Sequence, residues 1–165
     1  MFDADNMPTP YEVTGVRVKP EWIDHNGHMN VAFYLLAFDE SIGSLFEYFG
    51  LTDHYRHARQ VTTFVGDFHI HYVRELMEGD PIRITHQLVD CDHKRMHLCQ
   101  AMYHADEGYL AAQSELISLH VDARERRVAP MGEDLFARVD AVRQAHARLD
   151  TPTNRGRLIG MRRHS

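Results

Sequence analysis

The longest regular pattern of hydrophobic positions lies between Asn30 and Phe49, where apolar residues recur every three or four positions. The apolar set is Tyr34, Leu35, Phe38, Ile42, Leu45, Phe46 and Phe49, and the other side carries Glu40, Gly43, Ser44 and Glu47. This spacing predicts one long amphipathic helix. Asn30 can cap its first turn, and Gly50 can adopt the left-handed conformation that ends a helix.

Alternation of apolar and polar residues predicts strands on both sides of this helix. A first strand is expected over 13–19, where Pro20 stops it, and a second over 64–73, after a polar connector or short helix at 51–60. Three more strands, from Ile82, over 95–104 and over 109–122, are joined by short polar turns and form an antiparallel meander. A second amphipathic helix is predicted over 133–149.

The element order predicts an α+β fold in which a curved antiparallel sheet wraps around one long central helix, with a further C-terminal helix. Residues 13–149 form a single domain, preceded by a leader at 1–12 and followed by a flexible basic tail at 150–165. The sheet retains edge strands, so dimerisation by extension of the sheet is plausible.

Composition narrows the function. The formal net charge of −6 argues against nucleic-acid binding, which needs a positive surface. No apolar stretch is long enough for a membrane span and the N-terminus is acidic, so we expect a soluble, cytoplasmic protein without membrane partners. The two cysteines, Cys91 and Cys99, are expected to be free thiols in the core.

The stretch DHNGHMN, Asp24 to Asn30, places a carboxylate, two imidazoles and two amides at the start of the long helix. The free N–H groups and positive dipole end of a helix polarise an approaching carbonyl oxygen. A carboxylate beside them can act as general base or nucleophile. Read from the residues alone, the stretch is either an acyl-transfer site or a helix cap with a turn at Gly27.

The spacing of Asp24, Asn26, His28, Asn30 and Tyr34 resembles the motif that opens the central helix of hotdog-fold thioesterases, notably the plant acyl-carrier-protein thioesterases and the 4-hydroxybenzoyl-CoA thioesterase group. The segment YVRE, which ends at Glu75, resembles a second motif of the plant enzymes. The chain departs from the plant pattern at Val31 and Leu76, where those enzymes have an asparagine and a cysteine.

The resemblance implies an acyl-CoA thioesterase that uses no cofactor or metal. By position, Asp24 would be the general base or nucleophile, and Asn26 and His28 would orient water or the thioester. Glu75 would be a possible second carboxylate. The amides of Met29, Asn30 and Val31 would polarise the carbonyl, and Glu40 within the helix is the less favoured alternative to Asp24.

The implied partners are an acyl-CoA substrate and a second copy of the chain, in a homodimer or homotetramer with active sites at subunit interfaces. The whole chain resembles small bacterial thioesterases of carnitine breakdown that act on betainyl-CoA. A quaternary ammonium group binds to aromatic faces, and the candidates are Trp22, Phe33, Tyr34, Phe38 and Tyr72. The same aromatic residues could instead be core.

Two other functions stay open. A hotdog module could bind an acyl thioester without hydrolysing it. Alternatively, His69 and His71 on one strand face, with Glu75, resemble half of a cupin metal motif and could bind zinc or iron. The absence of a second cupin motif and the presence of a long central helix weigh against the metal alternative.

Overall fold

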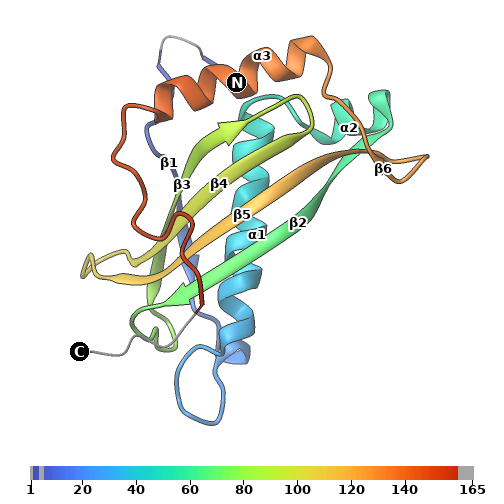
Figure 1. Cartoon of the computed structure of the whole chain (residues 1–165). Coiled ribbons are helices and arrows are strands. Elements are labelled where there is room, and N and C mark those ends of the chain that lie inside the picture. Colours follow the sequence, from blue (N-terminus) through green and yellow to red (C-terminus); the bar gives the residue numbers. More distant parts are fainter. Residues whose placement is uncertain (1, 4–5, 160–165) are drawn as a thin grey trace.

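One six-stranded antiparallel sheet curves around a long helix in the computed structural model, which describes residues 2–3 and 6–159 (Figure 1). The elements in chain order are β1 (Tyr11–Arg17), a 3-10 turn (Pro20–Trp22), α1 (Val31–Tyr48), α2 (Asp53–Arg59), β2 (Val61–Tyr72), β3 (Pro81–Cys91), β4 (Arg95–His104), β5 (Leu110–Asp122), β6 (Arg127–Val128) and α3 (Glu133–His146). The predicted fold class is confirmed.

Helix α1 is the predicted central helix, and both of its expected end signals are present. The Asn30 side chain accepts a hydrogen bond from Ala32 N at 3.0 Å, and Gly50 has a φ of +99° just after the helix. The inner side of α1 buries Phe38 and Leu45 completely against the sheet. Each such side chain contributes about 1.5–3 kcal/mol through burial, which holds the sheet around the helix.

The strands follow the order β1-β3-β4-β5-β2, with β6 paired to the end of β5. Strands β3, β4 and β5 form the predicted meander, and β2 crosses over to pair with β5. Strand β2 begins three residues earlier than the alternation predicted, at Val61. The crossover leaves β2, one of the longest strands, at an edge of the sheet.

Helix α3 packs at the end of the sheet beside the C-terminal end of α1, where Arg138 Nε donates to Phe49 O at 2.7 Å, and the segment that follows α3 runs over the outer face of the sheet (Figure 1). Helix α3 begins at the predicted residue and ends at His146, before the predicted Leu149. In the segment behind it, the buried Asn154 side chain donates a hydrogen bond to Ser114 O at 2.9 Å. The sequence predicted a loose tail over 150–165, of which 160–165 lie outside the described residues.

Over the part of the chain that the structure describes, no helix combines the length and the apolar character that crossing a membrane requires.

Candidate active site at the start of α1

Backbone hydrogen bonds fix the conformation of the loop Asp24–His28. Asp24 N donates to His28 O at 3.1 Å, and Gly27 N donates to Asp24 O at 3.0 Å. Gly27 has a φ of +82°, a conformation that costs little only for glycine. A bridge between Ile23 and Met29 closes the base of the loop. The DHNGHMN stretch is therefore a structured loop that leads directly into α1.

The Asp24 carboxylate is held by polar donors on both oxygens. Oδ1 accepts a hydrogen bond from Asn26 N at 2.8 Å, and Oδ2 accepts one from the Asn30 side chain at 3.3 Å. The bond from Asn26 N, helped by nearby His28 and by Asn30, lowers the pKa of Asp24 below its ordinary value. Asp24 is thus an ionised carboxylate at neutral pH, accessible to solvent and fixed at the start of the helix.

The backbone N–H groups at the start of α1 are not equally available. Met29 N donates to Leu76 O at 2.8 Å, and Asn30 N donates to Trp22 O at 2.9 Å. Ala32 N is taken by the capping side chain. Among the described residues, none accepts a hydrogen bond from Val31 N. Of the three amides expected to polarise a carbonyl, two are engaged in the fold and Val31 N remains.

A cavity of about 180 Å³ opens beside this helix start. The residues that line it are His28, Met29, Val31, Tyr34, Tyr72, Val73, Arg74 and Glu75. Six residues of the predicted site therefore meet here, although they come from the loop, from α1 and from the end of β2.

Two tyrosines form the aromatic wall of the cavity. Tyr34 and Tyr72 lie edge to face, with ring centroids 5.3 Å apart. The hydroxyl of Tyr72 donates to Val31 O at 3.2 Å, and the hydroxyl of Tyr34 accepts a hydrogen bond from Leu76 N at 3.2 Å. Burial raises the pKa of Tyr34 to about 12, so its ring stays neutral. The wall is rigid because each hydroxyl is tied to backbone.

The other predicted residues, Asp24, Asn26 and Asn30 among them, do not line the cavity. Trp22 and Phe38 are 2% and 0% exposed and belong to the core, where Trp22 stacks on Phe33 with centroids 5.7 Å apart. Their role is to support the loop and the helix from the core. Glu40 is exposed on α1, more than two turns beyond the helix start.

The suggested metal set of His69, His71 and Glu75 is not brought together. Glu75 lines the cavity at the helix start, whereas His69 lies on the outer face of the sheet, in a second pocket. Among the described residues, a different group of three metal-donor side chains lies together, because the donor atoms of His97, Cys99 and Glu115 are all within 4.8 Å of one another. The sequence reading did not connect these three residues.

Comparison with known proteins identifies the family. The family model of the thioesterase-like superfamily matches residues 18–139. A betainyl-CoA thioesterase from Pseudomonas aeruginosa is 37% identical over 93% of this chain and 94% of its own length. An L-carnitine dehydrogenase/betainyl-CoA thioesterase from Rhizobium meliloti is 30% identical over 93% of this chain, which spans 31% of that longer protein.

Among solved structures, a protein of Staphylococcus aureus determined in complex with CoA superimposes with a TM-score of 0.85. The two sequences are 26% identical, and the match covers 95% of this chain and 99% of the other. The agreement extends over the central helix, the sheet and the covering segments alike. The chain belongs to the thioesterase-like superfamily, and the predicted class, a thioester hydrolase of hotdog fold, is confirmed.

Proposed function

We propose that Asp24 drives hydrolysis of an acyl-CoA thioester, either by activating a water molecule or by attacking the carbonyl carbon. In the first case Asp24 takes the proton of water as the hydroxide adds to carbon, and the CoA thiolate leaves. In the second case the Asp24 carboxylate adds to the carbonyl carbon, the C–S bond breaks and the CoA thiolate leaves, and water then hydrolyses the mixed anhydride to free acid and the Asp24 carboxylate. The observation that carries the proposal is the ionised Asp24 carboxylate, held by Asn30 at the start of α1.

The oxyanion partner that we propose is Val31 N. Its N–H is at the first turn of an 18-residue helix, whose positive end favours the charge that develops on the thioester oxygen. It borders the same cavity as His28 and Tyr72. Met29 N and Asn30 N support this role indirectly, since their own hydrogen bonds fix the loop and the helix start relative to each other.

The acyl group that we propose is small and cationic, of the betainyl type. A trimethylammonium group is stabilised by aromatic faces and by carboxylates. Tyr34 and Tyr72 supply the faces, and Glu75 supplies a carboxylate at the rim. Arg74, the opposing charge, stacks 3.8 Å from the Tyr109 ring centre and lies 3.8 Å from Glu107, so part of its field is compensated. The P. aeruginosa relative supports the same substrate class.

A homodimer joined along β2 would complete this site. Among the described residues, β2 is an edge of the sheet. It exposes Phe64, Val65 and Tyr72, Val73 is exposed just after it, and α1 exposes Val31, Leu35 and Leu36. Apolar edges of this length are normally covered. The cavity reaches the same edge through Val31, Tyr72 and Val73. A second copy paired along β2 would therefore form the missing wall of the cavity.

The test is release of free CoA thiol from a matched panel of esters. Betainyl-CoA is compared with 3,3-dimethylbutyryl-CoA, which has the same shape with carbon in place of the cationic nitrogen, and with aromatic and long-chain esters. We expect turnover that is fastest on betainyl-CoA and unchanged by a chelator. Binding of the esters without turnover would favour an acyl-thioester binding module, and loss of the rate with chelator would favour a metal enzyme.

Equal rates on betainyl-CoA and its neutral analogue would overturn the cationic acyl group while leaving thioesterase activity intact. The two parts of the proposal are thus separable.

A further inference from the structure

Three potential metal ligands lie together on the outer face of the sheet, opposite to α1. His97 and Cys99 point to the same face of β4 because they are two residues apart, and Glu115 on β5 is the direct partner of Cys99 in the ladder. His97 Nε2 lies 2.7 Å from Glu115 Oε1. The donor atoms of the three side chains all lie within 4.8 Å of one another.

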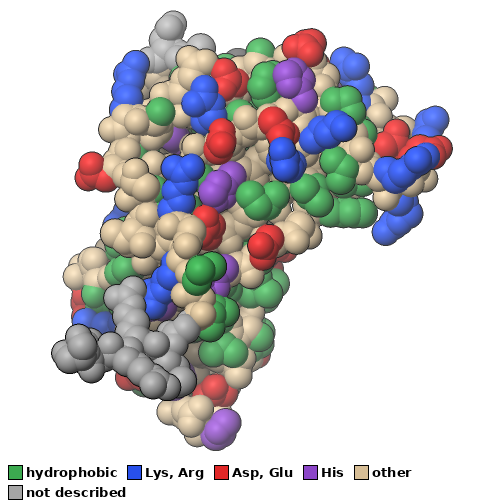
Figure 2. Space-filling view, in the orientation of Figure 1, with side chains coloured by type: hydrophobic (Ala, Val, Ile, Leu, Met, Phe, Trp, Pro, Cys, Tyr) green, Lys and Arg blue, Asp and Glu red, His purple; other side chains and the backbone are tan. Residues whose placement is uncertain are grey.

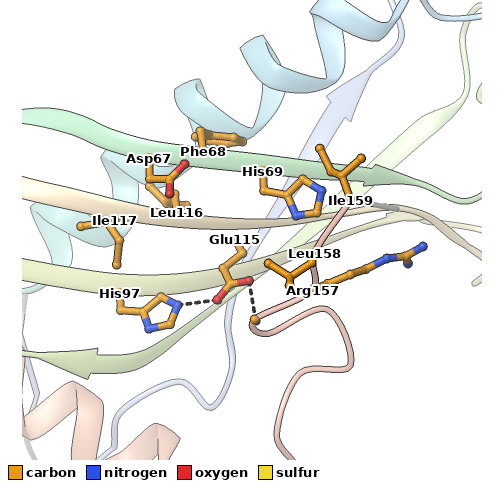
Figure 3. Close-up of a pocket in the computed structure, with 11 residues that line it drawn as sticks. Asp67, Phe68, His69, His97, Glu115, Leu116, Ile117, Arg157, Leu158 and Ile159 are labelled. Carbon is orange, nitrogen blue, oxygen red and sulfur yellow. Dashed lines mark hydrogen bonds and ion pairs between the residues drawn. The ribbon is translucent and has the colours of Figure 1, made fainter. Parts of the chain in front are cut away.

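The three side chains are largely shielded from solvent and held by hydrogen bonds, unlike a cluster of exposed surface residues. Cys99 is 3% exposed, and the side chains of His97 and Glu115 are 22% and 16% exposed. The second oxygen of Glu115 accepts a hydrogen bond from Gly156 N at 2.7 Å, which fixes the carboxylate (Figure 3). Hydrogen bonds of this kind orient the ligands of metal sites.

An open pocket adjoins the group. It has a volume of about 530 Å³, and His97 and Glu115 form part of its wall. His69 and Asp67 of β2 point into it from the other side, and His69 is the ladder partner of Glu115 (Figure 3). Figure 2 shows this face with histidine, acidic and basic side chains interspersed across its middle. The three donors thus have space beside them for a fourth ligand.

A cysteine nucleophile is the competing reading, since cysteine, histidine and a carboxylate also form hydrolytic sites. A nucleophile must be a thiolate, and His97 would have to act as its base. Here His97 Nε2 is hydrogen-bonded to Glu115 at 2.7 Å, so it is engaged with the carboxylate and is not placed to act as the base of Cys99.

We propose that His97, Cys99 and Glu115 form a binding site for Zn²⁺ or a similar transition-metal ion, with the fourth position open to water or to His69. Imidazole, thiolate and carboxylate are the ligand types that zinc prefers. Tetrahedral zinc places such atoms about 3.3–3.6 Å apart. The His97 to Glu115 contact, now 2.7 Å, must open by about 0.6 Å, and the Cys99 sulfur, within 4.8 Å of the other donors, must move inward by up to about 1.2 Å, which side-chain torsions permit.

Protons and charge balance without a further reactant. The Cys99 thiol releases one proton to solvent as its sulfur binds the ion. The proton between His97 and Glu115 moves to His97 Nδ1 or leaves. Binding therefore tightens as pH rises. Arg155, whose charge reaches Cys99, opposes the cation.

The site would hold the C-terminal segment on the sheet. Gly156 is bonded to Glu115, Asn154 is buried against β5, and Arg157 contacts His71 on β2. An ion bound to Glu115 would fix the carboxylate that accepts the hydrogen bond from Gly156 N. The Asp24 loop is part of the helix start and shares no residue with this group, so the ion has no place in thioester hydrolysis.

The experiment titrates Co²⁺, then Zn²⁺ in competition, into the chelator-treated full chain without substrate. We expect one saturable site per chain, with a thiolate-to-cobalt charge-transfer band in the near ultraviolet. Cys99→Ala loses the band and weakens binding by at least about 100-fold, and His97→Gln weakens it comparably. Arg155→Gln tightens binding. Zn²⁺ raises the melting temperature of the wild type and not of Cys99→Ala.

Two variants serve as matched controls. Cys91→Ala removes the other thiol, and His54→Gln removes an exposed histidine of α2, so both should keep the band and the affinity. A band of equal strength in Cys99→Ala, or no saturable binding by the wild type, overturns the proposal. Because Cys99→Ala could disturb the core, Glu115→Gln at the rim is measured as well. These readouts do not depend on acyl-CoA turnover, so failure here leaves the proposed thioesterase mechanism standing.

Discussion

The side chain of Asn30 connects the cap of α1 to the carboxylate of Asp24. Its oxygen accepts the Ala32 N–H at 3.0 Å, and its nitrogen donates to Asp24 Oδ2 at 3.3 Å. One amide therefore satisfies an orphan N–H of the helix and lowers the pKa of the neighbouring acid. Substitutions at position 30 can separate these two effects.

Asn30→Asp keeps an acceptor for the cap but replaces the donor to Asp24 with a second negative charge. Like charges disfavour ionisation, so the pKa of Asp24 should rise. The acid limb of the pH profile of kcat/KM should move to higher pH, because the reactive form is the carboxylate and it is lost as pH falls through its pKa. Asn30→Ser, which keeps a cap without added charge, should shift the limb less.

Measurements of stability distinguish the capping role of Asn30 from its effect on the Asp24 carboxylate. Asn30→Ala removes the cap and should lower the free energy of unfolding by about 0.5–2 kcal/mol, measured by urea denaturation. Asn30→Asp keeps the cap, so its loss of stability should come from repulsion with Asp24 and should shrink as pH falls and the two carboxyls are protonated. An unshifted acid limb in Asn30→Asp would show that Asp24 does not set it.

Asp24→Asn should reduce kcat for thioester hydrolysis by about 10²–10⁴-fold, since it removes the base or nucleophile and keeps the shape. The oligomeric state and the melting temperature should be unchanged, because Asp24 lies at the surface of the loop. Glu40→Gln and Glu75→Gln are the comparison variants. A wild-type rate in Asp24→Asn, with loss in either of the others, would move the catalytic role to that carboxylate.

Tyr72→Leu should lose activity selectively on betainyl-CoA. Removing one aromatic face from a cation costs about 0.5–2 kcal/mol, which corresponds to about a 2- to 30-fold fall in kcat/KM. The rate on 3,3-dimethylbutyryl-CoA should fall less. Tyr72→Phe keeps the ring and loses only the bond to Val31 O, so it should retain the preference. A parallel loss on both esters would contradict recognition of the charge.

Leu35→Lys places a charge on the apolar face that we assign to the dimer. Leu35 is 44% exposed and lies one turn beyond Val31, which Tyr72 contacts. Sedimentation velocity should show a shift toward the monomer and a fall in activity per chain, while circular dichroism stays unchanged. The exposed Leu158, on the C-terminal segment, is the control position. A dimer of undiminished affinity in Leu35→Lys would place the interface elsewhere.

The free energy of unfolding should fall as pH drops below about 6.5. Burial lowers the pKa of His86 to about 3, so the unfolded chain binds a proton at this position between about pH 6.5 and 3 that the folded chain does not. Stability therefore rises with pH in this window, by up to about 1.4 kcal/mol per pH unit for one histidine. Burial lowers the pKa values of His120 and His146 in the same sense.

His86→Gln tests this contribution, because an amide can keep the contact with Gln100. Urea unfolding between pH 4 and 7 should show a shallower dependence than in the wild type, by up to one proton. An equal slope would show that His86 does not contribute to the pH dependence.

Much of the fold follows from local patterns. Helix α1 is predictable because its apolar spacing and both end signals agree, and β4 is predictable because clear turns bound it. The start of β2 at Val61 is missed because its alternation is weak and pairing with β5 defines it. At the active site, the sequence groups Asp24 with the amides of 29–31. It does not reveal that Trp22 O and Leu76 O already occupy two of those amides.

The proximity of His97, Cys99 and Glu115 could not be predicted from the sequence. The tight turn at 105–108 pairs Tyr103 with Leu110, and continuing that register would place Ser114 opposite Cys99. A bulge after Tyr103 shifts the pairing by one residue, so Glu115 takes that place instead. A shift of one residue exchanges the faces of a strand. The bulge has no clear sequence signal, and the group is therefore invisible until the structure is known.

The hydrogen bond from Met29 N to Leu76 O ties the Asp24 loop to the segment that carries Glu75. The proposed base and the rim of the proposed acyl pocket are therefore linked and should move together. Engineering of this enzyme toward bulkier acyl groups by altering residues 73–77 would displace the reactive carboxylate as well. Because Tyr34 is bonded to the same Leu76, substrate range is better widened across the proposed subunit boundary.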